Sequence, residues 1–207
     1  MTRHKSSEER IDEIIKAAID EVDCHGLAEL TMEGIIARTS LSKGGVYRFF
    51  KNKGEVVRAL AWYITDELSS VDIEECLSWG LGLKETVLRR FVHKDFTPEG
   101  LKLQRVILQL IPEILKDEGL HPIFAKRDRV IEEQYLGLSR AVMRRDGREF
   151  SAAMEEGLVR FIHMGQAMAY GLTLMGMRGV SLKDLESLFR HFLDVAMEVI
   201  EQRQATS

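Results

Sequence analysis

The sequence contains little that is typical of a secreted or membrane protein. Its 207 residues include only two cysteines, Cys24 and Cys76, and no Cys-x-x-Cys pair, so structural disulfides are not expected. The first ten residues are charged and lack the apolar segment of a signal peptide. No apolar run approaches the length of a membrane span. We therefore expect a cytoplasmic protein that makes no membrane contact.

Patterns that mark an enzyme or a metal site are also missing. The six histidines are scattered, and the chain has no Ser/His/Asp or Cys/His order worth assigning and no Gly-rich phosphate loop. Glu118 and His121 have the spacing of a metal-binding helix, but Gly119 interrupts the pair and Pro122 follows it, so this segment is predicted to be a helix boundary. No enzymatic activity, cofactor or metal is expected.

Proline is scarce, and so is the alternation of β-branched residues that predicts strands. Three prolines leave long stretches free to be helical, and Leu, Ala, Met, Glu, Lys and Arg are frequent. The apolar share of 45% and the charged share of 30% are those of a globular chain. The predicted fold class is all-α, with about nine helices.

Acidic residues are absent from one stretch, Gly34 to Lys53, although the whole chain has a formal charge of −4. The stretch carries five cations, which are Arg38, Lys43, Arg48, Lys51 and Lys53. Two short segments of helical periodicity flank a polar joint, Thr39 to Ser42. A short helix pair with a tight turn and cations on its second helix suits the major groove of DNA.

A longer helix is predicted before this pair. Ser6 and Glu9 have the spacing of a capping box, and Gly26 suits a helix end. The residues from Met1 to Ser6 form a basic arm, for which we consider a frayed terminus and a contact with the DNA backbone or minor groove.

The stretch TMEGIIARTSLSKGGVYRFFKNK resembles the DNA-binding domain of TetR-family transcriptional regulators. Seven positions match the family's usual pattern: Thr31, Ile35, Ser42, Gly44, Tyr47, Phe50 and Lys53. Three positions depart from it, namely Ile36, Thr39 and Ser40. Ser40 stands where the family usually has glycine, so a slightly strained turn or an uncommon φ is expected there.

The resemblance implies roles for individual residues. Thr31, Ser42, Tyr47 and Lys53 would anchor phosphates, and Lys43, Gly44, Gly45 and Arg48 would lie against base edges. Because Gly45 has no side chain, direct readout would fall mostly on Lys43 and Arg48. The alternative for each is an ordinary solvated surface residue, whereas Val46, Phe49 and Phe50 are predicted to be core.

The sequence predicts two domains, a helix-turn-helix domain at 1–53 and a helical domain at 54–207. The second part carries 20 Lys and Arg against 24 Asp and Glu, so it has no basic surface for DNA. In the TetR family this part binds a small ligand. Five residues are candidates for the pocket: Trp62, Leu108, Phe124, Tyr135 and Met168.

The last two predicted helices have an apolar stripe that is wide for the end of a chain. We expect them to pair with a second copy in a four-helix bundle. The candidate interface residues are Leu158, Ile162, Leu185, Phe189, Phe192 and Ala196.

The sequence therefore predicts a homodimeric repressor that binds a palindromic operator in double-stranded DNA. A small, largely apolar molecule would release it from DNA. Release requires that this molecule bind the DNA-bound and free states of the dimer with different affinities. The alternatives are a helical protein-interaction module and a redox- or stress-sensing regulator without a small-molecule inducer.

Overall fold

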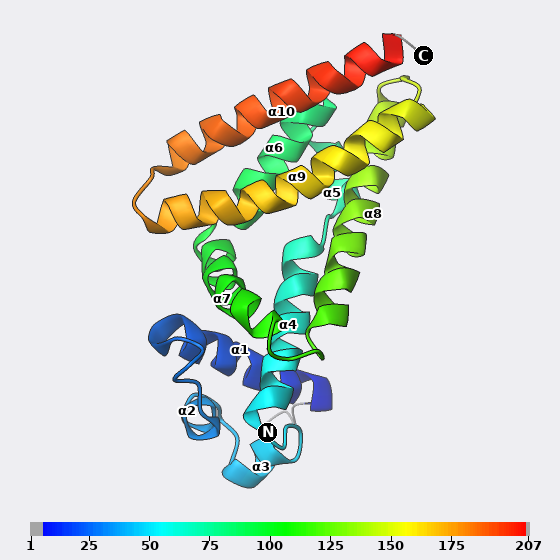
Figure 1. Cartoon of the computed structure of the whole chain (residues 1–207). Helices are drawn as coiled ribbons and strands as arrows, with labels where there is room; N and C mark the ends of the chain where they lie inside the picture. The colour runs from blue at the N-terminus through cyan, green and yellow to red at the C-terminus, as the bar shows by residue number, and fades with distance from the viewer. Residues whose placement is uncertain (1–5, 206–207) are drawn as a thin grey trace. The chain divides into compact units, whose positions relative to one another are not determined.

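The computed structural model describes residues 6–205, and every regular element among them is a helix (Figure 1). The ten helices are α1 (Ser7–His25), α2 (Met32–Ala37), α3 (Lys43–Tyr47), α4 (Lys53–Ser69), α5 (Ile73–Ser78), α6 (Leu83–Asp95), α7 (Pro98–Ile114), α8 (His121–Arg145), α9 (Ala152–Met177) and α10 (Leu182–Ala205). The all-α prediction is confirmed. The basic arm at residues 1–5 lies outside the described residues.

The chain divides into two compact units. The first contains Met1–Glu67 and Arg105–Phe124, and the second contains Leu68–Gln104 and Ala125–Ser207. These units are defined by packing, so α4 goes largely with the helix-turn-helix. The division by function at residues 53 and 54 stays a prediction.

The first unit is held together by an apolar core and by polar bonds to its second segment. Arg105 donates two hydrogen bonds to Asp23, at 2.8 Å from Nε and 2.9 Å from Nη2. Gln109 accepts the backbone N–H of Leu27 at 2.8 Å. The core contains Ile14, Ala18, Ile35, Val46, Leu60, Ile107 and Leu110, all of which are buried. Residues 105–124 thus fix the loop that precedes α2.

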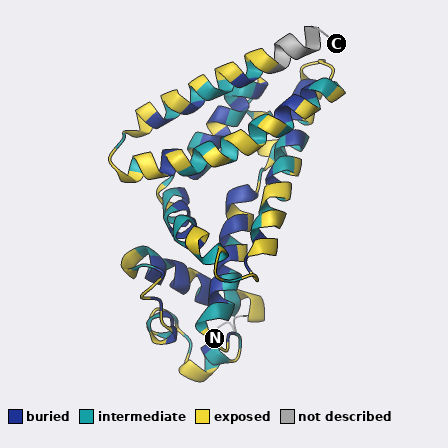
Figure 2. Cartoon of the chain, in the orientation of Figure 1, coloured by how far each residue is buried: buried dark blue, intermediate teal, exposed yellow. Residues whose placement is uncertain are grey.

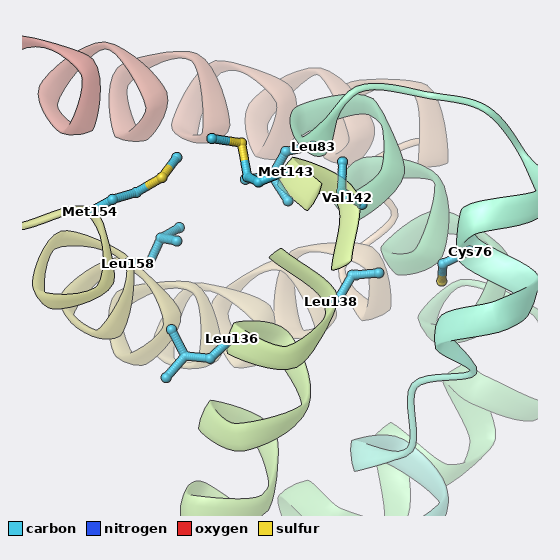
Figure 3. Packing of buried hydrophobic residues seen from close by; sticks show 8 residues of the cluster. All are labelled: Cys76, Leu83, Leu136, Leu138, Val142, Met143, Met154 and Leu158. Atoms are coloured by element: carbon cyan, nitrogen blue, oxygen red, sulfur yellow. The ribbon is translucent and has the colours of Figure 1, made fainter. Parts of the chain in front are cut away.

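The second unit contains two apolar clusters. One lies around α8 and the start of α9, and its buried members are Cys76, Leu83, Leu136, Leu138, Val142, Met143, Met154 and Leu158 (Figure 3). The other joins α6, α9 and α10 through a stack of rings, in which the centroids of Phe91 and Phe189 are 3.8 Å apart. Helices α9 and α10 run antiparallel beside each other (Figure 1).

Candidate nucleic-acid interface

The helices of the helix-turn-helix both begin at a hydroxyl cap. The Thr31 side chain accepts the N–H of Gly34 at 3.0 Å, and the Ser42 side chain accepts the N–H of Gly45 at 3.2 Å. A cap satisfies a backbone donor that a short helix would otherwise leave unpaired, and it contributes about 1 kcal/mol. Each hydroxyl still has its own hydrogen to donate to a phosphate.

The joint between α2 and α3 is fixed by side chains. The Thr39 hydroxyl donates to the Ile36 carbonyl at 3.0 Å and accepts the Leu41 N–H at 3.3 Å. The Ser40 N–H donates to the Glu13 carboxylate of α1 at 2.6 Å. The expectation of an uncommon φ at Ser40 is wrong, because no described residue other than glycine has a positive φ.

The carboxylate of Glu21 on α1 fixes the position of α2. Arg38 Nε donates a hydrogen bond to it, and His25 Nδ1 lies 3.3 Å from its other oxygen. A Cβ on Gly34 would lie 2.5 Å from this carboxylate, which therefore occupies the space that the absent side chain leaves. Arg38 is thus bonded within the domain. The bond from Arg38 is the main reason that the pKa of Glu21 lies below its ordinary value.

The start of α3 presents an exposed group without acids. Ser42, Lys43, Gly44 and Arg48 are all exposed. Lys43 Nζ lies 3.9 Å from Glu33, but both side chains are more than two thirds exposed, so this pair holds the ammonium weakly. Ser42, Lys43 and Gly44 lie at the N-terminus of α3, where backbone N–H groups favour an anion, and Arg48 caps its C-terminus one turn beyond Gly44.

The two glycines of α3 differ in their surroundings. A Cβ on Gly44 would meet no atom within 4 Å, whereas one on Gly45 would meet Leu41 and Ser42 at 3.4 Å. Packing within the chain therefore gives no reason for glycine at position 44. Since glycine costs about 1 kcal/mol relative to alanine in a helix, close approach of another backbone is the physical reason we assign to it.

The other predicted phosphate anchors lie in different settings. Lys53 Nζ donates to the carbonyls of Leu27 at 3.0 Å and Ala28 at 3.2 Å, so two of its three hydrogens fix the loop before α2. Tyr47 is half-buried, and the Lys43 ammonium lies 5.8 Å from its ring centroid. Val46 and Phe50 are buried, as predicted for core residues.

The candidate pocket residues are divided between the two packing units. Trp62, Leu108 and Phe124 belong to the first unit, and Trp62 is exposed on α4. Tyr135 and Met168 belong to the second unit, where Met168 packs on the cluster of α6, α9 and α10. The pocket stays a prediction.

The candidate interface residues lie mostly inside the chain. Leu158, Leu185, Phe189 and Ala196 are buried, and Ile162 and Phe192 are half-buried beside them. A neighbouring stripe on α9 and α10 is exposed instead (Figure 2). We name it the α9–α10 stripe, and its members are Met164, Ala167, Gly171, Leu174, Leu188, Val195 and Val199.

The cysteines and the acidic groups add no second site. Cys24 is exposed and Cys76 is buried, and burial raises the pKa of the Cys76 thiol. Within residues 6–205 no group of three or more His, Cys, Asp or Glu side chains is placed to hold a metal ion. No helix in the part of the chain that the structure describes is long and apolar enough to cross a membrane.

Known proteins share this fold and this motif. Residues 14–60 match the model of the bacterial regulatory proteins of the tetR family. A putative TetR-family regulator from Mesorhizobium loti has a TM-score of 0.71 and 16% identity, with 95% of this chain and 98% of that one covered. A tetR-family regulator from Streptomyces coelicolor has a TM-score of 0.68 and 19% identity over 97% and 87% of the chains. LfrR from Mycobacterium smegmatis, solved with proflavine, has a TM-score of 0.60 and 20% identity over 92% and 98%.

The site defines a class of protein, and the comparisons agree with it. A capped helix pair with an exposed cationic start to its second helix, inside an all-α fold, defines a helix-turn-helix protein of the DNA-binding type. The match over residues 14–60 confirms, for this segment, the resemblance to the DNA-binding domain of TetR-family regulators that was drawn from the sequence. No curated protein sequence matches the chain.

The Glu21 contact predicts how the stability of the first unit depends on pH. Because the pKa of Glu21 is lowered in the folded state, its stabilising effect is present above the ordinary value of 4.5 and is lost as the pH falls through the folded value. Urea unfolding at pH 7 and at pH 3.5 should therefore show a larger loss in the parent than in Glu21→Gln. An equal loss in both proteins contradicts the assignment.

Proposed function

We propose that this protein is a cytoplasmic, homodimeric transcriptional repressor that binds a palindromic operator and is released by a small, largely apolar molecule. The observation that carries the proposal is the exposed cationic side of α3, where Lys43 at the first helical position and Arg48 at the C-cap flank Gly44, a glycine that packing does not require. Cations and helix N-terminal N–H groups in this arrangement suit phosphates and the guanine edge in the major groove.

Each residue of this surface has a distinct role in the proposal. Lys43 and Arg48 read bases, because they are the exposed cations at the two ends of α3, and the one ion pair of Lys43, with Glu33, is weak. The Thr31, Ser42 and Tyr47 hydroxyls donate to phosphates. Gly44 and Gly45 allow the DNA backbone to approach, and Lys53 contributes one remaining hydrogen while it fixes the domain.

Dimerisation follows from the α9–α10 stripe. Its apolar side chains recur at helical spacing on two adjacent helices, and Leu188 and Val195 lie two turns apart on α10. A second copy related by a two-fold axis would cover both stripes at once. Such a dimer has two α3 helices, one for each half-site of a palindrome whose half-site centres are about 34 Å apart, which is one turn of DNA.

Two observations support an effector. The helical part at 54–207 has more acidic than basic residues and so is unsuited to DNA, and the resemblance to the TetR family implies that this part binds a small ligand. LfrR, which shares the fold, was solved with proflavine. A ligand of this kind acts only if it binds the operator-bound and free states of the dimer with different affinities. The alternative function is a helical protein-interaction module. That function does not explain the exposed cations of α3.

Removal of the two proposed base readers tests DNA recognition. Lys43→Ala with Arg48→Ala should weaken binding to a selected operator by about 100-fold or more, because each base contact contributes about 1–3 kcal/mol. Fluorescence anisotropy at fixed salt measures the change. The control is Arg144→Ala with Lys183→Ala, which removes the same charge from exposed positions of the second unit. Equal affinity of the two double variants would refute the assignment.

A charge on the stripe tests dimerisation. Leu188→Glu with Val195→Glu should give a monomer by light scattering, because two carboxylates would be buried in an apolar interface without partners. Lys183→Glu makes the same change of two charges at an exposed position on α10 off the stripe and should stay dimeric. A dimeric mass for the stripe variant, with an unchanged circular dichroism spectrum, counts against the proposed interface.

A further inference from the structure

The second unit contains buried nitrogen donors that have no partner. Among the described residues, the side-chain nitrogens in this state are Arg90 Nε, Arg127 Nε and Gln166 Nε2. The Arg90 and Arg127 side chains are only 5% and 9% exposed. A buried donor without an acceptor is unfavourable, so each such group calls for an explanation.

Arg127 of α8 lies against α9 one turn from Gln166. Two ion pairs show the order of contacts between these helices, Arg140 to Glu155 at 2.7 Å and Glu132 to His163 at 3.1 Å. Arg127 comes earlier on α8, and its guanidinium lies 5.3 Å from the ring centroid of Tyr170, which comes later on α9. Gln166 is one turn before Tyr170 on α9, so it lies on the same face.

Arg90 of α6 joins this neighbourhood through Tyr135 and Asp95. Its guanidinium lies 5.9 Å from the Tyr135 ring centroid and 3.1 Å from the Asp95 carboxylate. It also donates at 3.0 Å to the carbonyls of Leu68 and Ser70. The charges of both Arg90 and Arg127 act on Tyr135 and on Asp95. Two guanidinium groups thus share one buried region with one carboxylate.

The balance of charge and of donors in this region favours an anion. Asp95 is bonded to Arg90, and the only acid that pairs with Arg127 in the described structure is Asp128, at 3.5 Å and 53% exposed. Burial raises the pKa of both Tyr135 and Tyr170, so their phenols stay neutral and can donate. Nearer the loop between α8 and α9, the contact is filled by apolar side chains such as Leu136, Met154 and Leu158 (Figure 3).

We propose that the effector is an organic acid whose carboxylate is bound by Arg127, with Gln166 and Arg90 as further donors, while its apolar body meets the Tyr135 and Tyr170 rings. An Arg guanidinium and a carboxylate form paired, charge-assisted hydrogen bonds, which is why arginine serves this recognition. The inference rests on the proposed function for the consequence of binding. It changes the expected chemistry of the effector from apolar to amphiphilic.

The test compares acids with their neutral amides on the full-length protein. Three pairs serve as probes: benzoate and benzamide, octanoate and octanamide, and 1-naphthylacetate and 1-naphthylacetamide. At least one acid at millimolar concentration should raise Tm by about 2 °C or more, and its amide by less than half as much. If only water binds these donors, the acid and the amide will raise Tm by the same amount in every pair, and the proposal is overturned. Absence of any shift overturns it as well.

Variants assign the effect to Arg127. Arg127→Met should abolish the difference between acid and amide, and Arg144→Met, which changes an exposed arginine of the same helix, should keep it. If Arg127→Met does not fold, Arg127→Lys, which lacks the Nε donor, should reduce the difference. Survival of the difference in the folded Arg127 variant overturns the assignment.

Operator binding separates this inference from the function on which it rests. A protein that binds selected DNA but does not distinguish acid from amide keeps the regulator function and loses the carboxylate site. A protein that prefers the acid through Arg127 but has no sequence-specific DNA binding keeps the site and loses the regulator function.

Discussion

The helix-turn-helix depends on carboxylates that α1 supplies. Glu21 accepts from Arg38 in the space left by Gly34, and Glu13 accepts the N–H of Ser40 in the joint. These bonds fix α2 and the turn on α1, so α3 begins in one defined orientation. A reading helix must be positioned to within about 1 Å for its base contacts to form. In the proposed function, the two acids on the first helix would position α3 for DNA without touching DNA themselves.

The cations of the helix-turn-helix fall into two groups, those bonded within the domain and those exposed to solvent. Arg38 and Lys53 are bonded to groups of the domain, whereas Lys43 and Arg48, at the two ends of α3, are exposed. The second unit repeats the contrast with arginines. Arg90 has partners for most of its donors, whereas Arg127 has a weak partner and a buried nitrogen without one. In both units we assign to a ligand the cations whose hydrogen-bond donors are not fully used within the chain, which are Lys43 and Arg48 in the first unit and Arg127 in the second.

Local sequence patterns predicted the helix class, the caps at Ser6, Thr31 and Ser42, and the motif, because these depend on residues a few positions apart. The bonds of Glu21 and Glu13 span 17 and 27 residues, and no local pattern encodes them. The wide apolar stripe of α10 was visible in the sequence. Which side of it faces α6 and α9 depends on packing, so Leu185 and Phe189 are buried inside the chain while Leu188 and Val195 are exposed.

In the proposed function, this helix pair reads DNA as one half of a symmetric dimer. Selection of bound duplexes from a random pool tests it most directly, because a two-fold protein imposes its symmetry on the site that it selects. The account predicts an inverted repeat with half-site centres about 10 base pairs apart, or a multiple of that spacing. Enrichment of a single asymmetric site, or of no sequence, would contradict it.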